Sequence, residues 1–162
     1  MKRIWINNNV YQEMLDEAND KAPLETGGLL VGYFSRDNTE IVATGMVGPG
    51  LNAVHGECFF SPDEDYQREE MGRIYDEKDG QIFYLGDWHT HPSGPGILSG
   101  KDKKALRNIA RFPDNYVDNP SMLVLYGNVN QWRPRAWRIS GSPFFLFCSY
   151  LDLDVVFYNS RP

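Results

Sequence analysis

The pattern of apolar and polar positions predicts short strands separated by helices. Residues 3–6 alternate between the two kinds and predict a strand. Residues 7–21 repeat apolar side chains at helical spacing, with Val10, Met14 and Leu15 on one face. One of Asn7 to Asn9 is the expected N-cap of this helix.

Two apolar runs follow the first helix. Residues 27–34, GGLLVGYF, are almost continuously apolar, which predicts a strand buried on both faces. Residues 39–48 form a second run after the polar segment 35–38, so we expect the two runs to form a hairpin.

The clearest helix is predicted over residues 61–80. Ser61 is the expected N-cap, Pro62 the first helical residue and Glu64 the partner in a capping box. Gly80 is expected to end the helix. Its acidic side chains fit a solvated face better than a docking face.

The second half of the chain repeats the alternation of strands and helices. We expect a buried strand over 81–89, a helix over 99–112, strands over 121–127 and 135–140, and an exposed loop over 113–120. Residues 143–159 are strongly apolar and fit a last strand pair, a docking element or a dimer contact. The expected fold is α/β, a single domain whose mixed β-sheet is sandwiched by helices.

Composition limits the class of protein. The 162 residues suit one domain, and the net charge of −6 without a basic stripe argues against direct nucleic-acid binding. Cys58 and Cys148 form neither a disulfide framework nor a metal pair, so we expect buried thiols and a cytoplasmic protein. The sequence has no apolar run of the roughly 20 residues that a membrane helix needs, and its N-terminus does not resemble a signal peptide.

Chemistry concentrates in residues 86–102, GDWHTHPSGPGILSGKD. His89 and His91 stand two apart at a strand end, so both imidazoles point to the same side and can bind one metal ion. Such a pair alone is weak support for a metal site, because polar pairs at strand ends are common.

Ser99 and Asp102 follow with the spacing of a helix capping box. Taken alone, this motif favours a cap over a ligand, although a cap can also direct the aspartate towards a metal. Two histidines and a carboxylate are the protein ligands of a catalytic zinc, which keeps its fourth position for water. The HExxH motif is absent from the sequence, so a general base must come from elsewhere.

The stretch HTHPSGPGILSGKD resembles the signature H-x-H-P-x6-S-x-x-D of the JAMM (MPN-plus, JAB-domain) zinc metalloproteases. His89, His91, Pro92, Ser99 and Asp102 match it without a spacing error. The family also has a glutamate before a glycine-rich strand, and LETGGLLVGYF supplies Glu25 there. The resemblance spans roughly residues 1 to 140. It divides the chain into a JAB/MPN domain, 1–142, and an apolar extension, 143–162, packed on the same domain.

The resemblance implies a JAB/MPN, cytidine-deaminase-like fold and one zinc ion held by His89, His91 and Asp102. Glu25 is then the general base and Ser99 the oxyanion donor. The implied reaction is hydrolysis of the amide bond after the C-terminal tail of a ubiquitin-like or similarly conjugated protein. The segments 48–57 and 93–98 would line the groove for that tail.

Within the family, residues 48–69 and 84–92 look most similar to small bacterial JAB deconjugating peptidases of CBASS-type antiphage operons, which suggests E1- and E2-like partners. Two alternatives stay open: a zinc hydrolase of small amides, and a metal-binding scaffold without protease activity. A nucleoside deaminase would need H-x-E together with P-C-x-x-C, and this sequence has no P-C-x-x-C. Trp88 is expected in the core, and His55 outside the metal ligands.

Overall fold

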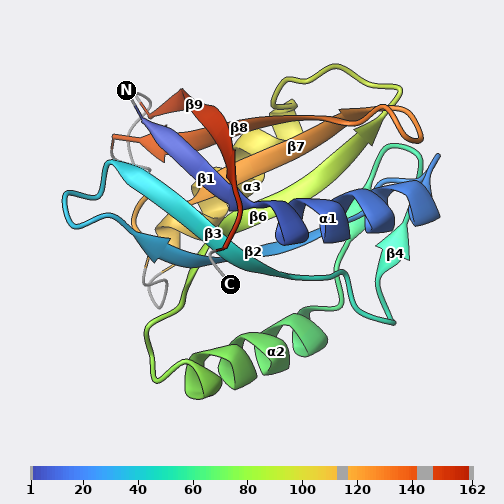
Figure 1. Ribbon diagram of the computed structural model, residues 1–162. Helices are drawn as coiled ribbons and strands as arrows, with labels where there is room; N and C mark the ends of the chain where they lie inside the picture. Colours follow the sequence, from blue (N-terminus) through green and yellow to red (C-terminus); the bar gives the residue numbers. More distant parts are fainter. Residues whose placement is uncertain (1, 113–116, 142–147, 161–162) are drawn as a thin grey trace.

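A strongly curved mixed sheet forms the centre of the protein (Figure 1). The computed structural model describes residues 2–112, 117–141 and 148–160. The elements follow one another as β1 (Arg3–Asn7), α1 (Asn8–Lys21), β2 (Gly27–Phe34), β3 (Glu40–Val47), β4 (Val54–His55), β5 (Phe60–Ser61), α2 (Glu64–Glu77), β6 (Phe83–Pro92), α3 (Gly100–Arg111), β7 (Ser121–Gly127), β8 (Arg133–Ser140) and β9 (Ser149–Tyr158).

Seven strands pair in the order β1-β3-β2-β6-β7-β8-β9, and the sheet closes into a barrel because β1 also pairs with β9. Both neighbours of β1 run parallel to it. Strand β6 lies between antiparallel β2 and parallel β7, so it is a central strand with a partner on each side. The remaining strands, β4 and β5, form a separate two-stranded ribbon.

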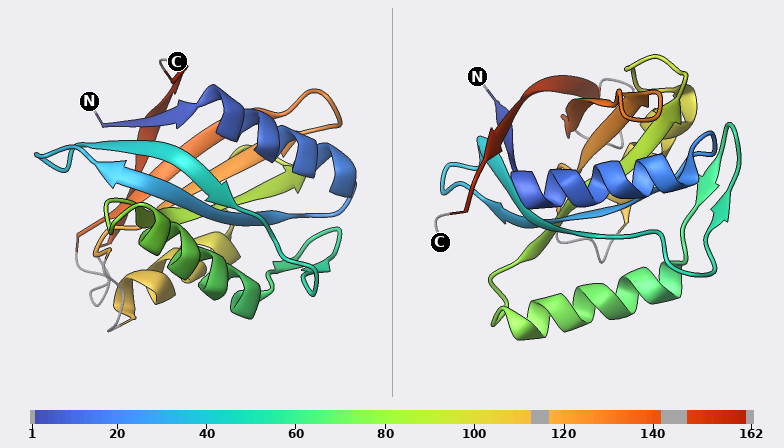
Figure 2. Two further views of the ribbon diagram at one scale, coloured as in Figure 1. Left: turned by 60° about the horizontal axis from the view of Figure 1, so that its bottom comes forward. Right: turned by 45° about the vertical axis from the view of Figure 1, so that its right-hand side comes forward.

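Helices cover the sheet on two sides, as Figure 2 shows. Helix α1 buries Val10, Met14 and Ala18 in the main core, which includes Ile4 and Ile6 of β1. Helices α2 and α3 lie on the opposite side of the sheet. A smaller core beneath α3 consists of Leu98, Leu106, Met122, Val124 and Trp137. The predicted fold class, one α/β domain with a mixed sheet between helices, is confirmed.

Local signals predicted two helix starts correctly. The side chain of Asn7 caps α1 by accepting a hydrogen bond from the backbone of Asn9 at 2.9 Å. Ser99 caps α3, and its capping box with Asp102 is complete. The hairpin of β2 and β3 is also confirmed.

The start of α2 was predicted wrongly. Its N-cap is Asp63, whose carboxylate accepts a hydrogen bond from the backbone N–H of Tyr66 at 3.2 Å. Glu64 is therefore the first helical residue. Ser61 instead pairs with Val54 in the β4–β5 ribbon. At the other end, the helix stops at Glu77 and Gly80 lies in the following turn with a positive φ of 68°.

Two other expectations need revision or lie outside the described residues. In the segment expected as an exposed loop, Val117 and Pro120 are buried, and residues 113–116 are not described. Residues 142–147, which contain the expected domain boundary, are not described either. From Ser149 onward the apolar tail is strand β9, paired with β8 and β1.

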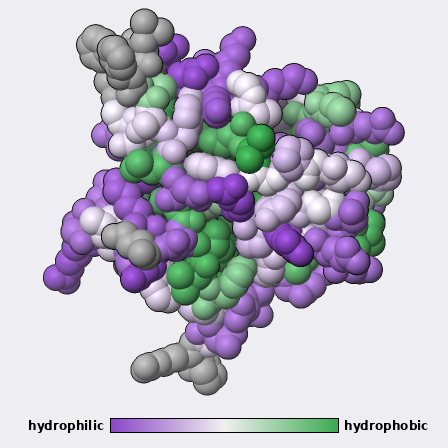
Figure 3. Space-filling model, turned by 90° about the horizontal axis from the view of Figure 1, so that it is seen from above, coloured by the Kyte–Doolittle hydropathy of each residue, from purple (hydrophilic) through white to green (hydrophobic). Residues whose placement is uncertain are grey.

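The surface mixes apolar and polar residues. On the face shown in Figure 3, apolar areas are separated by polar side chains, an ordinary arrangement for exposed apolar residues. Among the described residues, no helix is both long enough and apolar enough to span a membrane.

Candidate metal centre

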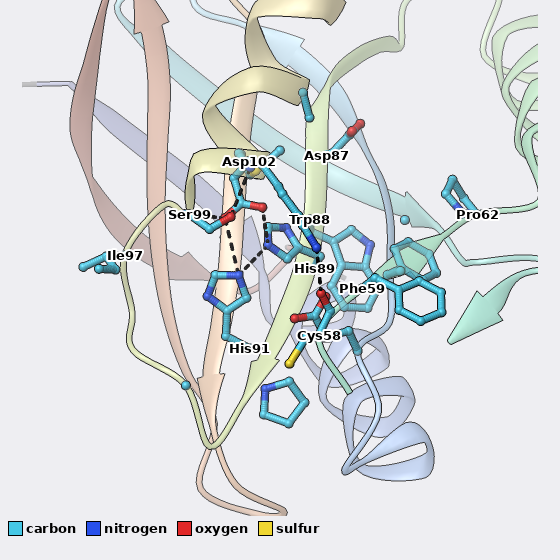
Figure 4. Close-up of a pocket in the computed structure, with 18 of the residues that line it drawn as sticks. Cys58, Phe59, Pro62, Asp87, Trp88, His89, His91, Ile97, Ser99 and Asp102 are labelled. Carbon is cyan, nitrogen blue, oxygen red and sulfur yellow. Dashed lines mark hydrogen bonds and ion pairs between the residues drawn. The ribbon is translucent and has the colours of Figure 1, made fainter. Parts of the chain in front are cut away.

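Three predicted ligands meet at the end of β6 (Figure 4). His89 and His91 lie at alternate positions of the strand, so both imidazoles point to one face. Asp102 reaches them from the first turn of α3. Each of the three side chains is 12% exposed, so the cluster is shielded but accessible.

The separations within this cluster suit a tetrahedral ion. The two histidine Nε2 atoms are 2.9 Å apart, and the carboxylate oxygens of Asp102 lie 3.2 Å from His89 Nε2 and 3.4 Å from His91 Nε2. Ligands about 2.1 Å from a tetrahedral zinc ion are roughly 3.4 Å from one another. The residues present therefore fit zinc, with two imidazole nitrogens and one carboxylate oxygen.

The turn after β6 orients His91. Its Nδ1 lies 3.1 Å from the carbonyl oxygen of Pro95, so Nδ1 carries a proton there, and Nε2 is the nitrogen that faces Asp102 and can bind a metal once it is deprotonated. Ser93 fixes the turn, because its backbone N–H donates a hydrogen bond to the carbonyl oxygen of Gly127 at 2.7 Å. This segment therefore both sets the imidazole tautomer and returns the chain to α3.

The capping box orients Asp102. The backbone N–H of Ser99 donates to Asp102 Oδ2 at 2.6 Å, and the backbone N–H of Asp102 donates to Ser99 Oγ at 3.1 Å. A hydroxyl that accepts one hydrogen bond still has its own proton to donate. The helix cap and a role for both side chains in the site are therefore compatible.

Hydrogen bonds in the cluster shift two pKa values. Burial alone would raise the pKa of Asp102, but hydrogen bonds from His89 and His91 hold it well below its ordinary range. Burial lowers the pKa of His91, yet the hydrogen bonds to Asp102 and Pro95 produce a net rise. Asp102 is consequently ionised at neutral pH, the form that binds a cation.

Glu25 lines the groove around the cluster. It lies two residues before β2, whose first residues pair with β6. Burial raises the pKa of its half-buried carboxyl, opposed by the nearby charges of His89 and His91. A raised pKa suits a carboxylate that must accept a proton near neutral pH.

The glycines after Glu25 allow β2 to lie close to the histidine strand. Gly27 is in register with His89, and a Cβ atom at position 27 would lie 2.3 Å from the carbonyl oxygen of Trp88. A Cβ at Gly28 would lie 1.9 Å from the carbonyl oxygen of Val47 on the other side. Neither position has room for a side chain, so the backbone of β2 lies close to both neighbouring strands here.

A groove of about 760 Å³ surrounds the cluster. In Figure 4 the metal-ligand cluster lies between Ile97 and Phe59. The lining is largely apolar and includes Leu29, Phe59, Phe60, Pro62, Pro95, Ile97 and Met122. Both segments expected beside the groove contribute to it, the first through Glu57 and the second through residues 94, 95 and 97.

The structure places near the site two residues that the sequence analysis did not include in it. Asp87 lies on the same face of β6 as the two histidines, lines the groove, and accepts a hydrogen bond from Tyr84 Oη at 2.7 Å. The alternation of Asp87, His89 and His91 could have indicated this. His55 is outside the ligand cluster, as expected, but its Nδ1 lies 2.9 Å from the carbonyl oxygen of Glu25.

Two single-residue expectations can be scored directly. Trp88 is buried in the main core, as predicted, and it is also one of the residues that line the groove. Cys58 was expected to be buried and is exposed, because it stands at the tip of the β4–β5 ribbon beside the groove. Cys148 is half-buried.

Comparison with known proteins agrees with the motif. Residues 7–140 match the family described as prokaryotic homologs of the JAB domain. The chain is 38% identical over 137 residues to "Probable metalloprotease y4qB" of Sinorhizobium fredii (strain NBRC 101917 / NGR234), covering 84% of this chain and 83% of the relative. It is 27% identical over 125 residues to a "CD-NTase/cGAS isopeptidase" of Enterobacter hormaechei subsp. hoffmannii (strain UCI 50), covering 77% and 68% of the two chains.

The fold has a counterpart among solved structures. The solution structure of protein DSY2949 from Desulfitobacterium hafniense superposes with a TM-score of 0.67 at 20% identity, covering 97% of this chain and 94% of that one. This likeness concerns the fold alone. The matched family, the 38% identical relative and the intact motif together show that the chain belongs to the prokaryotic JAB-domain metalloprotease family.

Proposed function

We propose that this protein is a zinc-dependent peptidase or isopeptidase. Its substrate is the amide bond that follows the C-terminal tail of a ubiquitin-like or similarly conjugated protein. One observation carries the proposal: two imidazoles and a carboxylate converge on one point of a groove that Glu25 also lines.

The residues divide the chemistry among them. His89, His91 and Asp102 would hold one zinc ion, which supplies a Lewis acid that lowers the pKa of a water molecule to about 7. Glu25 accepts a proton from the attacking water and returns it to the leaving amine. Ser99 donates its hydroxyl proton to the oxygen that gains negative charge in the transition state.

The groove supports an extended protein substrate. Its apolar walls come from separate segments on either side of the cluster, including Phe59 on the ribbon and Ile97 in the turn before α3. A chain with small residues next to the cut bond can lie between such walls with its backbone close to the ligands. The isopeptidase name of the Enterobacter hormaechei relative supports the same kind of bond.

We also propose a role in antiphage defence, in which E1- and E2-like proteins would form the conjugate that this enzyme removes. The "CD-NTase/cGAS isopeptidase" name of the Enterobacter hormaechei relative supports a conjugated substrate. We also propose a cytoplasmic location, consistent with free thiols at Cys58 and Cys148. Fractionation of cells expressing the protein from its own gene tests the location.

The deciding experiment is incubation with a panel of ubiquitin-like proteins that carry C-terminal extensions, followed by mass spectrometry of the products. We expect cleavage directly after the tail, loss of cleavage with a strong chelator, and recovery with zinc. Cys58→Ser and Cys148→Ser should keep most activity, and substitution is the suitable change because an alkyl group on Cys58 would enter the groove. Glu25→Gln is the inactive control, and Glu13→Gln, on the exposed side of α1, is its matched active control.

Each other outcome has a defined meaning. Cleavage of small amides alone would reassign the substrate and keep the metal chemistry. Zinc binding without cleavage of any probe would indicate a scaffold. Activity that resists the chelator and is lost in Cys58→Ser or Cys148→Ser would indicate a thiol protease and overturn the proposal.

A further inference from the structure

The backbone of Glu25 is held by two consecutive ribbon residues. Its N–H donates to the carbonyl oxygen of Gly56 at 2.8 Å, and its carbonyl oxygen lies 2.9 Å from His55 Nδ1. Because a carbonyl oxygen can only accept, Nδ1 of His55 must carry the proton in this contact. Both polar backbone groups of Glu25 therefore depend on β4 and the residue after it.

The ribbon itself is small. Its strands pair at only two positions, Val54 with Ser61 and His55 with Phe60, and it is separate from the barrel. A lone two-stranded ribbon is marginally stable, so its position depends on the contacts around it. One is the pair of bonds to Glu25, and another ties the tip to α3, where Lys101 Nζ donates to the carbonyl oxygen of Cys58 at 3.3 Å.

The ribbon tip is also a wall of the groove. Residues 57–60 line it, directly after the Gly56 that binds the backbone of Glu25. The ring of His55 lies 5.5 Å from that of Phe60, so the residue that bonds Glu25 also contacts the groove wall. A substrate in the groove therefore touches the same short segment that holds Glu25.

The next residue along the chain is fixed from the opposite side. The backbone N–H of Thr26 donates to Thr90 Oγ1 at 3.0 Å, and the backbone N–H of Thr90 donates to the carbonyl oxygen of Thr26 at 2.8 Å. Both threonines are fully buried, and Thr90 stands between the two histidine ligands. The barrel thus holds residue 26, while the ribbon holds residue 25.

We infer that His55 is a positioning residue for Glu25, and that the β4–β5 ribbon couples occupation of the groove to the placement of this carboxylate. The inference rests on the proposed function, in which Glu25 is the general base. His55 acts through the Glu25 backbone and does not touch the reacting bond. Displacing a catalytic group by about 1 Å can cost roughly a hundredfold in rate, so one lost hydrogen bond here is measurable.

Two substitutions separate the hydrogen bond from the ring. His55→Asn carries an amide N–H close to the position of Nδ1, so it can still donate to the carbonyl oxygen of Glu25. His55→Phe keeps a ring against Phe60 and has no donor. Melting temperatures establish whether both variants fold. If His55→Phe does not fold, His55→Gln replaces it, because the glutamine amide reaches beyond the position of Nδ1.

The kinetic test uses the fusion protein that the parent cuts fastest. We expect His55→Phe to lower kcat about tenfold to a hundredfold with little change in KM, and His55→Asn to recover most of that loss. In a Glu25→Gln background, His55→Phe should cause no further loss, because its effect passes through Glu25. Equal losses in His55→Asn and His55→Phe, or an undiminished loss in the Glu25→Gln background, overturn the inference.

A second test needs no substrate. The chain has three histidines, so ¹⁵N NMR of the imidazoles can be assigned by substitution. We expect the Nδ1–H tautomer for His55, and faster amide hydrogen exchange of Glu25 in His55→Phe than in His55→Asn. An Nε2–H tautomer, or unchanged exchange, contradicts the inference. If no fusion is cut, the proposed function fails, while this test still decides whether His55 holds Glu25.

Discussion

At the scale of single residues, Asp102 belongs both to the cap of a helix and to the candidate metal centre. Its carboxylate completes the capping box of α3 while its two oxygens face His89 and His91. The helix start therefore fixes the direction of the ligand before any ion binds. Because each oxygen has protein partners, a change at Ser99 or at either histidine also affects how Asp102 is held.

Removing both imidazoles should abolish zinc binding. We expect the His89→Ala, His91→Ala double variant to retain no stoichiometric zinc, because one carboxylate alone cannot complete a tetrahedral site. Elemental analysis of protein purified without chelator measures this. His55→Asn is the matched control and should keep one zinc per chain. Full zinc content in the double variant would place the site elsewhere.

Glu25→Gln should separate binding from catalysis. The amide is similar in size, so we expect unchanged zinc content and folding. Loss of a general base typically lowers the rate by about 10²- to 10⁴-fold. Kinetics on a cleaved fusion, with zinc analysis of the same sample, measures both. A variant within twofold of the parent would show that another group accepts the proton.

Ser99→Ala should have two separable costs. The lost N-cap should lower the free energy of unfolding by about 1 kcal/mol. The lost oxyanion donor should weaken transition-state binding by roughly 2.7–4 kcal/mol. Thermal unfolding measures the first and kcat the second, and Ser99→Thr, which keeps the hydroxyl, is the control. A change in stability alone would restrict Ser99 to capping.

At the scale of elements, the contact between β2 and β6 sets the position of the ligands. Gly27→Ala would place a methyl group 2.3 Å from the carbonyl oxygen of Trp88, next to His89. We expect a loss of about 1–3 kcal/mol in stability, as for an overpacked core, and weaker zinc binding. Thermal unfolding and zinc titration measure these changes.

The control for this substitution is Gly72→Ala. Gly72 lies inside α2 with open space where its Cβ would be, so alanine should stabilise the helix by roughly 0.5–1 kcal/mol. If Gly27→Ala were equally harmless, the close approach of β2 to β6 would not control the metal centre.

Elements whose signals are local could be predicted from the sequence. The cap of α3, the hairpin of β2 and β3, and the shared face of His89 and His91 depend on residues a few positions apart. The start of α2 could not, because Ser61 and Asp63 both suit an N-cap. Pairing of Ser61 with Val54 decided between them, and pairing across a loop has no local signature.

The residues around Glu25 illustrate the same limit within the site. Its motif identified the carboxylate, but its contacts with His55 and Gly56 join segments about 30 positions apart. A lone histidine in a polar segment carries no pattern that specifies its partner. The exposure of Cys58 follows from the position of the ribbon, so sequence patterns could not predict it either.

At the scale of the whole molecule, the tail completes the main core. Leu153 of β9 is 4% exposed and packs in the core cluster that contains Ile4 and Ile6. The apolar pattern of the tail was compatible with a strand pair, a docking element or a dimer contact, because the spacing of apolar residues alone cannot identify a partner strand. The pairing with β1 joins opposite ends of the described chain.

Truncating this side chain tests whether the tail and the domain unfold together. We expect Leu153→Ala to cost about 2–5 kcal/mol, the range for a cavity in a packed core. The exposed neighbour Asp154→Ala should change stability by less than about 0.5 kcal/mol. Denaturant unfolding followed by circular dichroism measures both. A small loss for Leu153→Ala would mean that β9 contributes little to the barrel.

Closure of the barrel also bears on the order in which the protein folds. Arg3 pairs with both Glu40 and Asp154, so the second pairing closes a loop roughly four times longer than the first. The extra loop entropy amounts to only about 1.2 kcal/mol, but contacts so distant in sequence slow folding strongly. Strands β2, β6 and β7 pair without β9. We therefore expect refolding chains to acquire zinc affinity in an early phase and to join β1 to β9 in a later, slower one.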